Sequence, residues 1–184
     1  MAIEPTLLEQ VLRTPESRDV RSSPIVTAVI LSDPGNAANL VPALDEIEGI
    51  RSRNARRILC LFAAAAVPHL VGALLGVGVH AREVGIDIIW SMMLGENQGT
   101  IRRTLTEILP DMHVLLDDKR PLPEPPPDPM EKDFPRRVCD HAFIALQELL
   151  DPDFDDLLFL TMEERDRDEE IRRFKARGIG LRVA

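Results

Sequence analysis

Leu40-Val41-Pro42-Ala43-Leu44 returns thirty residues further on as Leu70-Val71-Gly72-Ala73-Leu74. Each of these apolar runs is followed by a break and an amphipathic stretch, and the corresponding positions in the two stretches are Ala55/Gly85, Ile58/Ile88 and Leu59/Ile89. A period of this length indicates a stacked array of helix pairs, because one pair cannot bury its apolar face alone. The repeat therefore predicts an all-α fold in which neighbouring units share a core.

The composition agrees with this prediction. Hydrophobic residues make up 45% of the 184 residues, whereas aromatic residues make up 4%, with one tryptophan and no tyrosine. An apolar content of leucine, isoleucine, valine and alanine favours close-packed helices over a sheet sandwich. The length suits a single domain over residues 1–184 with a core of its own.

The pattern divides the domain into N-terminal helices (1–35), regular repeats (36–117), a proline-rich loop (118–134), and a last repeat with a capping helix (135–184). Apolar periodicity and proline or glycine breaks predict the individual helices. Their expected ranges are 5–13, 24–32, 36–47, 51–65, 68–75, 80–93, 101–109, 112–116 and 136–150.

The last helix has unusually clear signals. Thr161 and Glu164 have the spacing of a capping box at its start. Its apolar face is limited to Ile171 and Phe174, so we expect a polar helix that covers the end of the array. Acid-first pairs four residues apart support it, namely Glu163–Arg167, Asp168–Arg172 and Glu169–Arg173.

These segments resemble HEAT-repeat proteins of the short bacterial HEAT-like type. The resemblance covers residues 36–150 and rests on the segments 40–44, 67–74, 82–85 and 137–146. The chain departs from the family pattern at two positions: Ser52 stands where the family has an arginine, and Gly85 stands where it has an alanine. It implies a short right-handed α-α superhelix of about four helix pairs, with the second helices along the concave side. Most HEAT arrays are scaffolds and binding surfaces, and a minority act on DNA or on bound chromophores.

Stacking the second helices in register places one polar stripe opposite the core. Its candidate partner-binding residues are Arg53, Arg57, Glu83, Asp87, Trp90 and Asp140. Arg53 would face Glu83, and Arg57 would face Asp87. One interpretation is a ladder that fixes repeat register, each exposed pair contributing ~0–1 kcal/mol. The other is a binding face anchored by Trp90, although this tryptophan suits the core equally well.

The proline-rich stretch 121–129 excludes helix and central strand and predicts an extended polyproline conformation. Pro123, Pro125 and Pro126 form a candidate ligand for an aromatic groove. A plain connection between repeats is the alternative, but the stretch is longer than such a connection needs. It is therefore a second candidate contact with a partner.

The formal net charge of −9 disfavours nucleic-acid binding through the phosphate backbone. Acids outnumber bases 12 to 10 before Pro110 and 19 to 12 after it. Arg53, Arg56 and Arg57 form the densest basic group of the regular repeats. Such a group can bind phosphate or an acidic peptide, or it can be a solvated face.

No sequence signature of a phosphate loop, nucleophile elbow or zinc protease is present. Cys139, Asp140 and His141 point about 100° apart on a helix, so they do not converge; we expect Cys139 inside and the other two outside. Residues 151–156 begin like a calcium loop, but Asp156 and Met162 break the pattern. We therefore expect no metal, no cofactor and no catalysis.

The N-terminus has neither a basic region nor an apolar core of a signal peptide. Ile58–Val79 is strongly apolar, but Pro68 divides it, which favours a buried helix pair over a membrane span. Cys60 and Cys139 both lie in apolar patterns and are expected to be buried, reduced thiols. These features predict a soluble, cytoplasmic protein without a membrane segment.

The combined expectation is a non-catalytic adaptor or scaffold that binds another protein, with an apolar array end suited to docking into a larger assembly. Neutralisation of a basic toxin is a form of the same function. The first alternative is a HEAT-type enzyme or lyase acting on a bound small molecule or modified base, which needs a cleft of carboxylates and aromatics. The second is nucleic-acid binding through Arg53, Arg56 and Arg57.

Overall fold

The computed structural model describes residues 3–15, 17–47, 49–123, 136–151 and 153–177. Within these ranges the chain is mostly helical and has no β-strand, which confirms the all-α prediction. The elements are α1 (Pro5–Leu12), η1 (Val20–Ser22), η2 (Val26–Ile30), η3 (Pro34–Asp45), α2 (Ile50–Leu59), η4 (Ala64–Ala66), α3 (Val67–Leu74), α4 (Val79–Met93), α5 (Gln98–Leu115), α6 (Val138–Leu150), α7 (Asp156–Thr161) and α8 (Glu164–Arg177).

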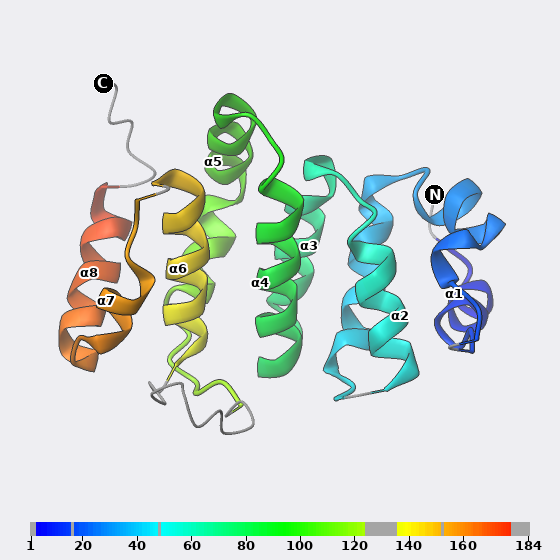
Figure 1. The fold of residues 1–184 in the computed structure, drawn as a ribbon, viewed down its shortest axis with the longest axis horizontal. Helices are drawn as coiled ribbons and strands as arrows, with labels where there is room; N and C mark the ends of the chain where they lie inside the picture. Colours follow the sequence, from blue (N-terminus) through cyan, green and yellow to red (C-terminus); the bar gives the residue numbers. More distant parts are fainter. Residues whose placement is uncertain (1–2, 16, 48, 124–135, 152, 178–184) are drawn as a thin grey trace.

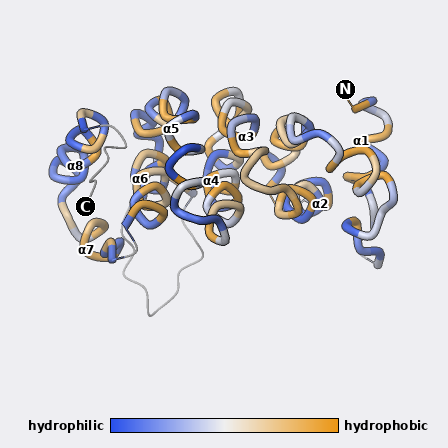
Figure 2. Tube along the Cα trace, turned by 90° about the horizontal axis from the view of Figure 1, so that it is seen from above, coloured by the Kyte–Doolittle hydropathy of each residue, from blue (hydrophilic) through white to orange (hydrophobic). Residues whose placement is uncertain are grey.

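The helices stand side by side in a row that runs from α1 at one end to α8 at the other (Figure 1). Seen from above, α2, α4 and α6 lie in one layer, and α3 and α5 lie in the other (Figure 2). The element η3 packs against α2, α3 and α4, and α4 also packs against α6. The first helices of the predicted pairs therefore form the back of the molecule, and the second helices form its front face.

The core contains the positions that the repeat predicted. Leu40 and Leu44 of η3, Leu70 and Leu74 of α3, and Ile58 of α2 are all inaccessible to solvent. At the equivalent positions Ala55, Ile88, Ile89, Ala142 and Leu146 are buried, and Ala145 is partly buried. Small residues bring neighbouring helices close together: a Cβ atom on Gly85 would lie 2.3 Å from Leu74 Cδ2.

The first repeat helix has tighter winding than predicted. The expected helix 36–47 is a 3₁₀ helix over Pro34–Asp45. Asp33 caps it by accepting a bond from the Gly35 amide at 2.9 Å. Before it, the predicted helix 24–32 is present over residues 24–30, but it winds as a π-helix over Val26–Ile30 (η2). The carbonyls of Val29 and Ile30 accept bonds from the Asn36 side chain. The buried amide of Asn36 thus joins η2 to η3.

The second helix of this pair is shorter than predicted. Helix α2 ends at Leu59 instead of residue 65, so Cys60 lies at its C-cap and is exposed, against the expectation of a buried thiol. Pro68 lies in the first turn of α3, where its missing amide costs nothing. No single helix of the described ranges has the length and hydropathy of a membrane span. Helix α2 and the helical segment Ala64–Leu74 have that length and hydropathy only when they are taken together, and the two are bent by 119° relative to each other.

Pro110 does not divide its helix, which contradicts the prediction of two pieces. Helix α5 runs without a break from Gln98 to Leu115 with Pro110 inside it. Pro110 and Thr106 are both exposed. Water can therefore bind the carbonyl that loses its intrahelical partner, which makes an interior proline tolerable.

The predicted start of the last helix is wrong. Thr161 is the last residue of α7, and its hydroxyl donates to the Leu158 carbonyl at 2.7 Å instead of capping α8. Ile171 and Phe174 are buried as expected, and Phe174 packs edge-on against Phe143 with ring centroids 5.6 Å apart. Of the three predicted pairs only Glu169–Arg173 forms, at 3.1 Å; Arg167 turns inward and Asp168 binds other partners.

Candidate functional site

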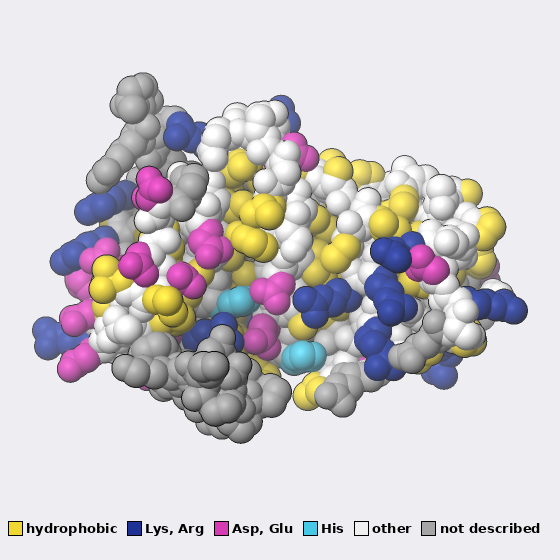
Figure 3. All heavy atoms as spheres, viewed as in Figure 1, with side chains coloured by type: hydrophobic (Ala, Val, Ile, Leu, Met, Phe, Trp, Pro, Cys, Tyr) yellow, Lys and Arg dark blue, Asp and Glu magenta, His cyan; other side chains and the backbone are white. Residues whose placement is uncertain are grey.

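The front face, formed by α2, α4 and α6, is divided by charge. Arg53, Arg56 and Arg57 are exposed on α2. Acidic side chains gather on the other part of the face, over α4, α6 and α7 (Figure 3). The front face thus carries a basic patch beside an acidic patch, on a chain whose net charge is −9.

The acids of α4 pair with histidines. Glu83 Oε2 lies 3.8 Å from His80 Nδ1, and Asp87 Oδ1 lies 2.9 Å from His141 Nε2 of α6. No ion pair joins Arg57 to Asp87 within the described ranges, so this rung of the predicted ladder is absent. Helix α4 packs more extensively on α6 than on α2, which explains why Asp87 bonds to α6.

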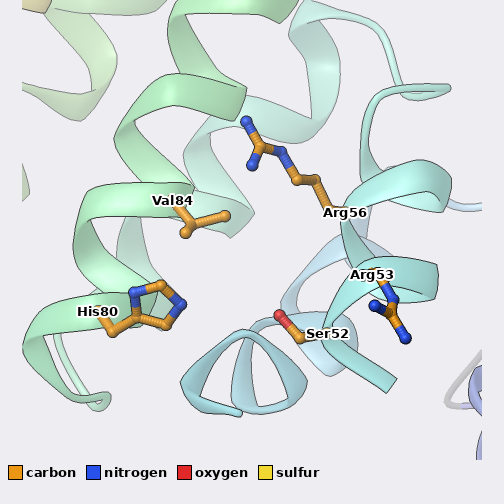
Figure 4. A pocket seen from close by; sticks show the side chains of 5 residues that line it. All are labelled: Ser52, Arg53, Arg56, His80 and Val84. Carbon is orange, nitrogen blue, oxygen red and sulfur yellow. The ribbon is translucent and has the colours of Figure 1, made fainter. Parts of the chain in front are cut away.

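A hollow of about 530 Å³ separates α2 from α4 on this face. Its lining residues are Ser52, Arg53, Arg56, His80 and Val84. Figure 4 shows Arg56 reaching from α2 toward α4, with the Ser52 hydroxyl and the His80 ring turned into the same space. Ser52 and His80 lie in the first turns of their helices, where the helix dipole is positive. The hollow therefore brings an arginine, a hydroxyl and an imidazole together from two helices.

Ser52 and His80 were not predicted as site residues. They line one hollow from different register positions of neighbouring second helices, and the repeat register does not bring such positions together. A useful signal was the placement of both residues in the first turn of a second helix, beside the arginine group.

Trp90 is not a freely presented anchor. Its side chain is partly buried and packs against the core. The indole Nε1 is buried and has no hydrogen-bond acceptor among the atoms that the structure describes. Trp90 therefore packs mainly in the core.

Asp140 does not lie on the surface, which corrects its assignment to the binding stripe. It is completely buried and accepts bonds from Arg137, at 2.8 and 3.0 Å, and from Arg167 of α8 at 2.8 Å. Both arginine side chains are buried too, at 7% and 3% exposure. Repeat register could not predict this, because the helix that covers Asp140 lies outside the repeat.

The same cluster extends to the surface. Arg137 also bonds to Asp168 of α8 at 2.9 Å, and Asp168 binds Lys119 at 2.5 Å. Burial alone raises the pKa of the Asp168 carboxyl, but Lys119 and Arg137 outweigh burial and hold it below the usual aspartate range. These ion pairs fasten α8 to α6 and to the segment before the proline-rich stretch.

Two short backbone segments meet where the proline-rich stretch leaves the array and returns to it. Leu122 N donates to Arg136 O at 2.9 Å, and Val138 N donates to Arg120 O at 3.1 Å, around the isolated Pro121–Arg137 bridge. Pro123 is exposed just after the bridge. Pro125 and Pro126, the other candidate contacts, lie outside the described residues.

A second ion cluster holds this bridge to the repeats. Asp118 accepts bonds from Arg120 at 2.8 Å and from Arg82 of α4 at 2.7 Å. Burial alone raises the pKa of the Asp118 carboxyl, yet these arginines lower it below the usual aspartate range. Arg82 also donates to the carbonyls of Leu75 and Val77, so it connects the turn before α4 to the bridge.

The remaining candidate catalytic and metal-binding side chains do not come together at one site. Cys139 is buried, which raises the pKa of its thiol to about 11, and His141 faces Asp87 instead. In the acidic loop, Asp155 caps α7 by accepting from the Leu158 amide at 2.8 Å. No group of three or more histidine, cysteine, aspartate or glutamate side chains suited to a metal occurs in the described ranges.

The ends of the array also expose apolar side chains. Leu157 and Leu158 of α7 are 63% and 59% exposed. Near the other end, Leu31, Leu61 and Phe62 help to line an apolar hollow of about 240 Å³.

Comparison with known proteins gives no relative for this chain: no protein family, no curated protein and no solved structure matches it.

Proposed function

We propose that this chain is a HEAT-like helical array that acts as a non-catalytic adaptor and binds another protein on its front face. The supporting observation is the charge-divided, hollowed surface of α2, α4 and α6, where Arg56 and Arg57 are exposed and have no carboxylate partner at ion-pair distance within the described ranges. Exposed charges left unpaired in a fixed pattern favour recognition of a complementary surface.

The mixture of charges favours a protein over nucleic acid. A nucleic-acid strand is uniformly negative and would bring phosphates close to Glu83 and Asp87, which lie on the same face as the arginines. A protein segment can instead place acidic groups over α2 and basic groups over α4 and α6. The size of the hollow, about 530 Å³, allows side chains of a partner to enter it.

The arrangement favours binding over catalysis. The Asp87–His141 pair is the best acid–base candidate of the face. The nearest hydroxyl along α4, that of Ser91, donates to the Asp87 backbone carbonyl at 2.9 Å instead of to the imidazole. A nucleophile activated by this histidine would need to be within hydrogen-bond reach of it.

The proposal is tested by affinity capture from the native lysate with nuclease treatment. The face variant exchanges two charges, Arg57→Glu with Asp87→Arg. The matched control makes the same exchange on α5, in the back layer, with Arg102→Glu and Glu107→Arg, both at exposed positions. Both variants keep the net charge of the wild type, and thermal melts establish that each is folded.

We expect a stoichiometric protein partner that survives nuclease, is retained by the α5 control and is lost by the face variant. A partner lost equally from both variants would contradict the proposed face. A partner that disappears with nuclease would support nucleic-acid binding. Capture of no protein, together with turnover of a small molecule, would support the enzyme hypothesis.

A further inference from the structure

The hollow between α2 and α4 brings three different hydrogen-bond donors together. Arg56 supplies a guanidinium, Ser52 a hydroxyl and His80 an imidazole, and Val84 forms part of the wall (Figure 4). Arg56 is exposed, and no carboxylate within the described ranges pairs with it. The guanidinium thus has five donors in a planar fork and open space in front of them.

The nearest acids are already engaged. Glu83 lies beside His80 at 3.8 Å, and Asp87 bonds to His141 at 2.9 Å, on the side of α4 that packs against α6. The positive charge of Arg56 therefore remains on the α2 side of the hollow. An oxyanion entering the hollow would gain bonds from both helices.

We propose that this hollow binds the carboxylate of a glutamate or aspartate side chain presented by a peptide segment of the partner protein. This inference rests on the proposed adaptor function and names the chemistry of the partner at one place. A carboxylate matches the guanidinium fork with two parallel N–H···O bonds. The Ser52 hydroxyl and an N–H of His80 can donate to the remaining lone pairs.

The surrounding charges favour a carboxylate over a phosphate. Glu83 lies beside His80, which lines the hollow, and Asp87 follows one turn later on α4; the repulsion from these acids grows with the charge of the ligand. A phosphate monoester carries nearly two negative charges at neutral pH, whereas a carboxylate carries one. A nucleic-acid backbone would continue past the hollow over the acidic patch of α4 and α6.

The experiment is an NMR titration of the ¹⁵N-labelled full chain with a capped peptide, acetyl-Ala-Glu-Ala-Ala-Ala-Glu-Ala-amide. Its twin with both glutamates replaced by glutamine is the ligand control. We expect saturable shifts of the amides of 51–57 and 79–84 with the glutamate peptide and none with the glutamine peptide. The same peptide with phosphoserine in place of glutamate, and a short DNA strand, are the competing ligands.

Arg56→Gln should weaken the glutamate peptide about fivefold to tenfold, the loss expected for one exposed charge-assisted contact. Arg102→Gln, which removes an exposed arginine of α5, should leave the affinity unchanged. No saturable shifts, equal shifts with the glutamine peptide, or tighter binding of the phosphoserine peptide or DNA would overturn the inference.

The two proposals fail differently. If lysate capture finds a partner whose binding is insensitive to Arg56→Gln, the adaptor function stands and the carboxylate site falls. If the peptide binds as expected but no protein partner is captured, the carboxylate site stands and the adaptor function falls.

Discussion

Replacing Asp140 by asparagine should destabilise the protein more than any exposed substitution of comparable size. The change keeps the shape of the side chain but leaves the buried guanidinium groups of Arg137 and Arg167 without their shared negative charge. Breaking a buried ion pair by removing one partner costs about 3–5 kcal/mol. The lower end applies here, because Arg137 keeps Asp168 at 2.9 Å.

A loss of about 3 kcal/mol should lower the urea midpoint by roughly 1.5 M at a slope near 2 kcal/mol/M. It should lower the melting temperature by roughly 6–12 °C for a chain of this size. The assay is urea unfolding followed by circular dichroism at 222 nm. Asp168→Asn is the matched control: this carboxylate is 33% exposed, and its loss leaves Arg137 bonded to Asp140.

The control should lose less than about 1 kcal/mol, as expected for a partly exposed pair. The reasoning is refuted if Asp140→Asn costs less than 1 kcal/mol, or no more than Asp168→Asn. Either result would mean that solvent or the remaining carboxylates compensate the two arginines.

Three further predictions concern thiols, glycines and pH. In the native protein one thiol per chain, Cys60, should react rapidly with Ellman's reagent, and Cys139 should react only after denaturation; Cys60→Ala should abolish the fast phase. Gly85→Ala should destabilise the protein by about 1–3 kcal/mol, because the added methyl group would collide with Leu74. Gly72→Ala, at an exposed helical site, should instead stabilise it by up to about 1 kcal/mol. If urea unfolding shows that both variants change the stability in the same direction, this prediction is wrong. Because the folded pKa of Asp118 lies below its unfolded value, its stabilisation is present above about pH 4 and is lost as the pH falls further; Asp118→Asn should flatten the decline of the urea midpoint between pH 5 and 3, and an unchanged decline would contradict it.

The repeat could be predicted from sequence because it is a property of buried positions. Ala55 and Gly85 are buried at equivalent positions of successive units, as are Ile58 and Ile88. The burial of such positions is decided by the neighbouring repeat unit alone, so it can be read from the repeat. The existence of the second helices and the exposure of Arg53 and Arg57 on α2 followed from the same periodicity.

The errors occurred where an element outside the repeat decides the outcome. Asp140 looks like a surface residue in the register of the repeat, yet α8 covers it with Arg167. Cys60 looks apolar by its neighbours, but α2 ends one residue earlier. Thr161 has the spacing of a capping residue, but α7 extends through it. The sequence around a residue does not show which distant helix packs against that residue. It also does not show to which of two adjoining short helices the residue belongs.

The backbone bridge at Pro121 and Arg137 gives the chain a place where its length can change during evolution. The chain leaves and re-enters the array at this paired position, so α5 and α6 are fixed independently of the number of residues between them. Doubling the length of a flexible connection costs only about 0.6 kcal/mol in closure entropy. Insertion of a further binding segment, or of a whole domain, between 123 and 136 would therefore leave the helical array intact and add a new specificity.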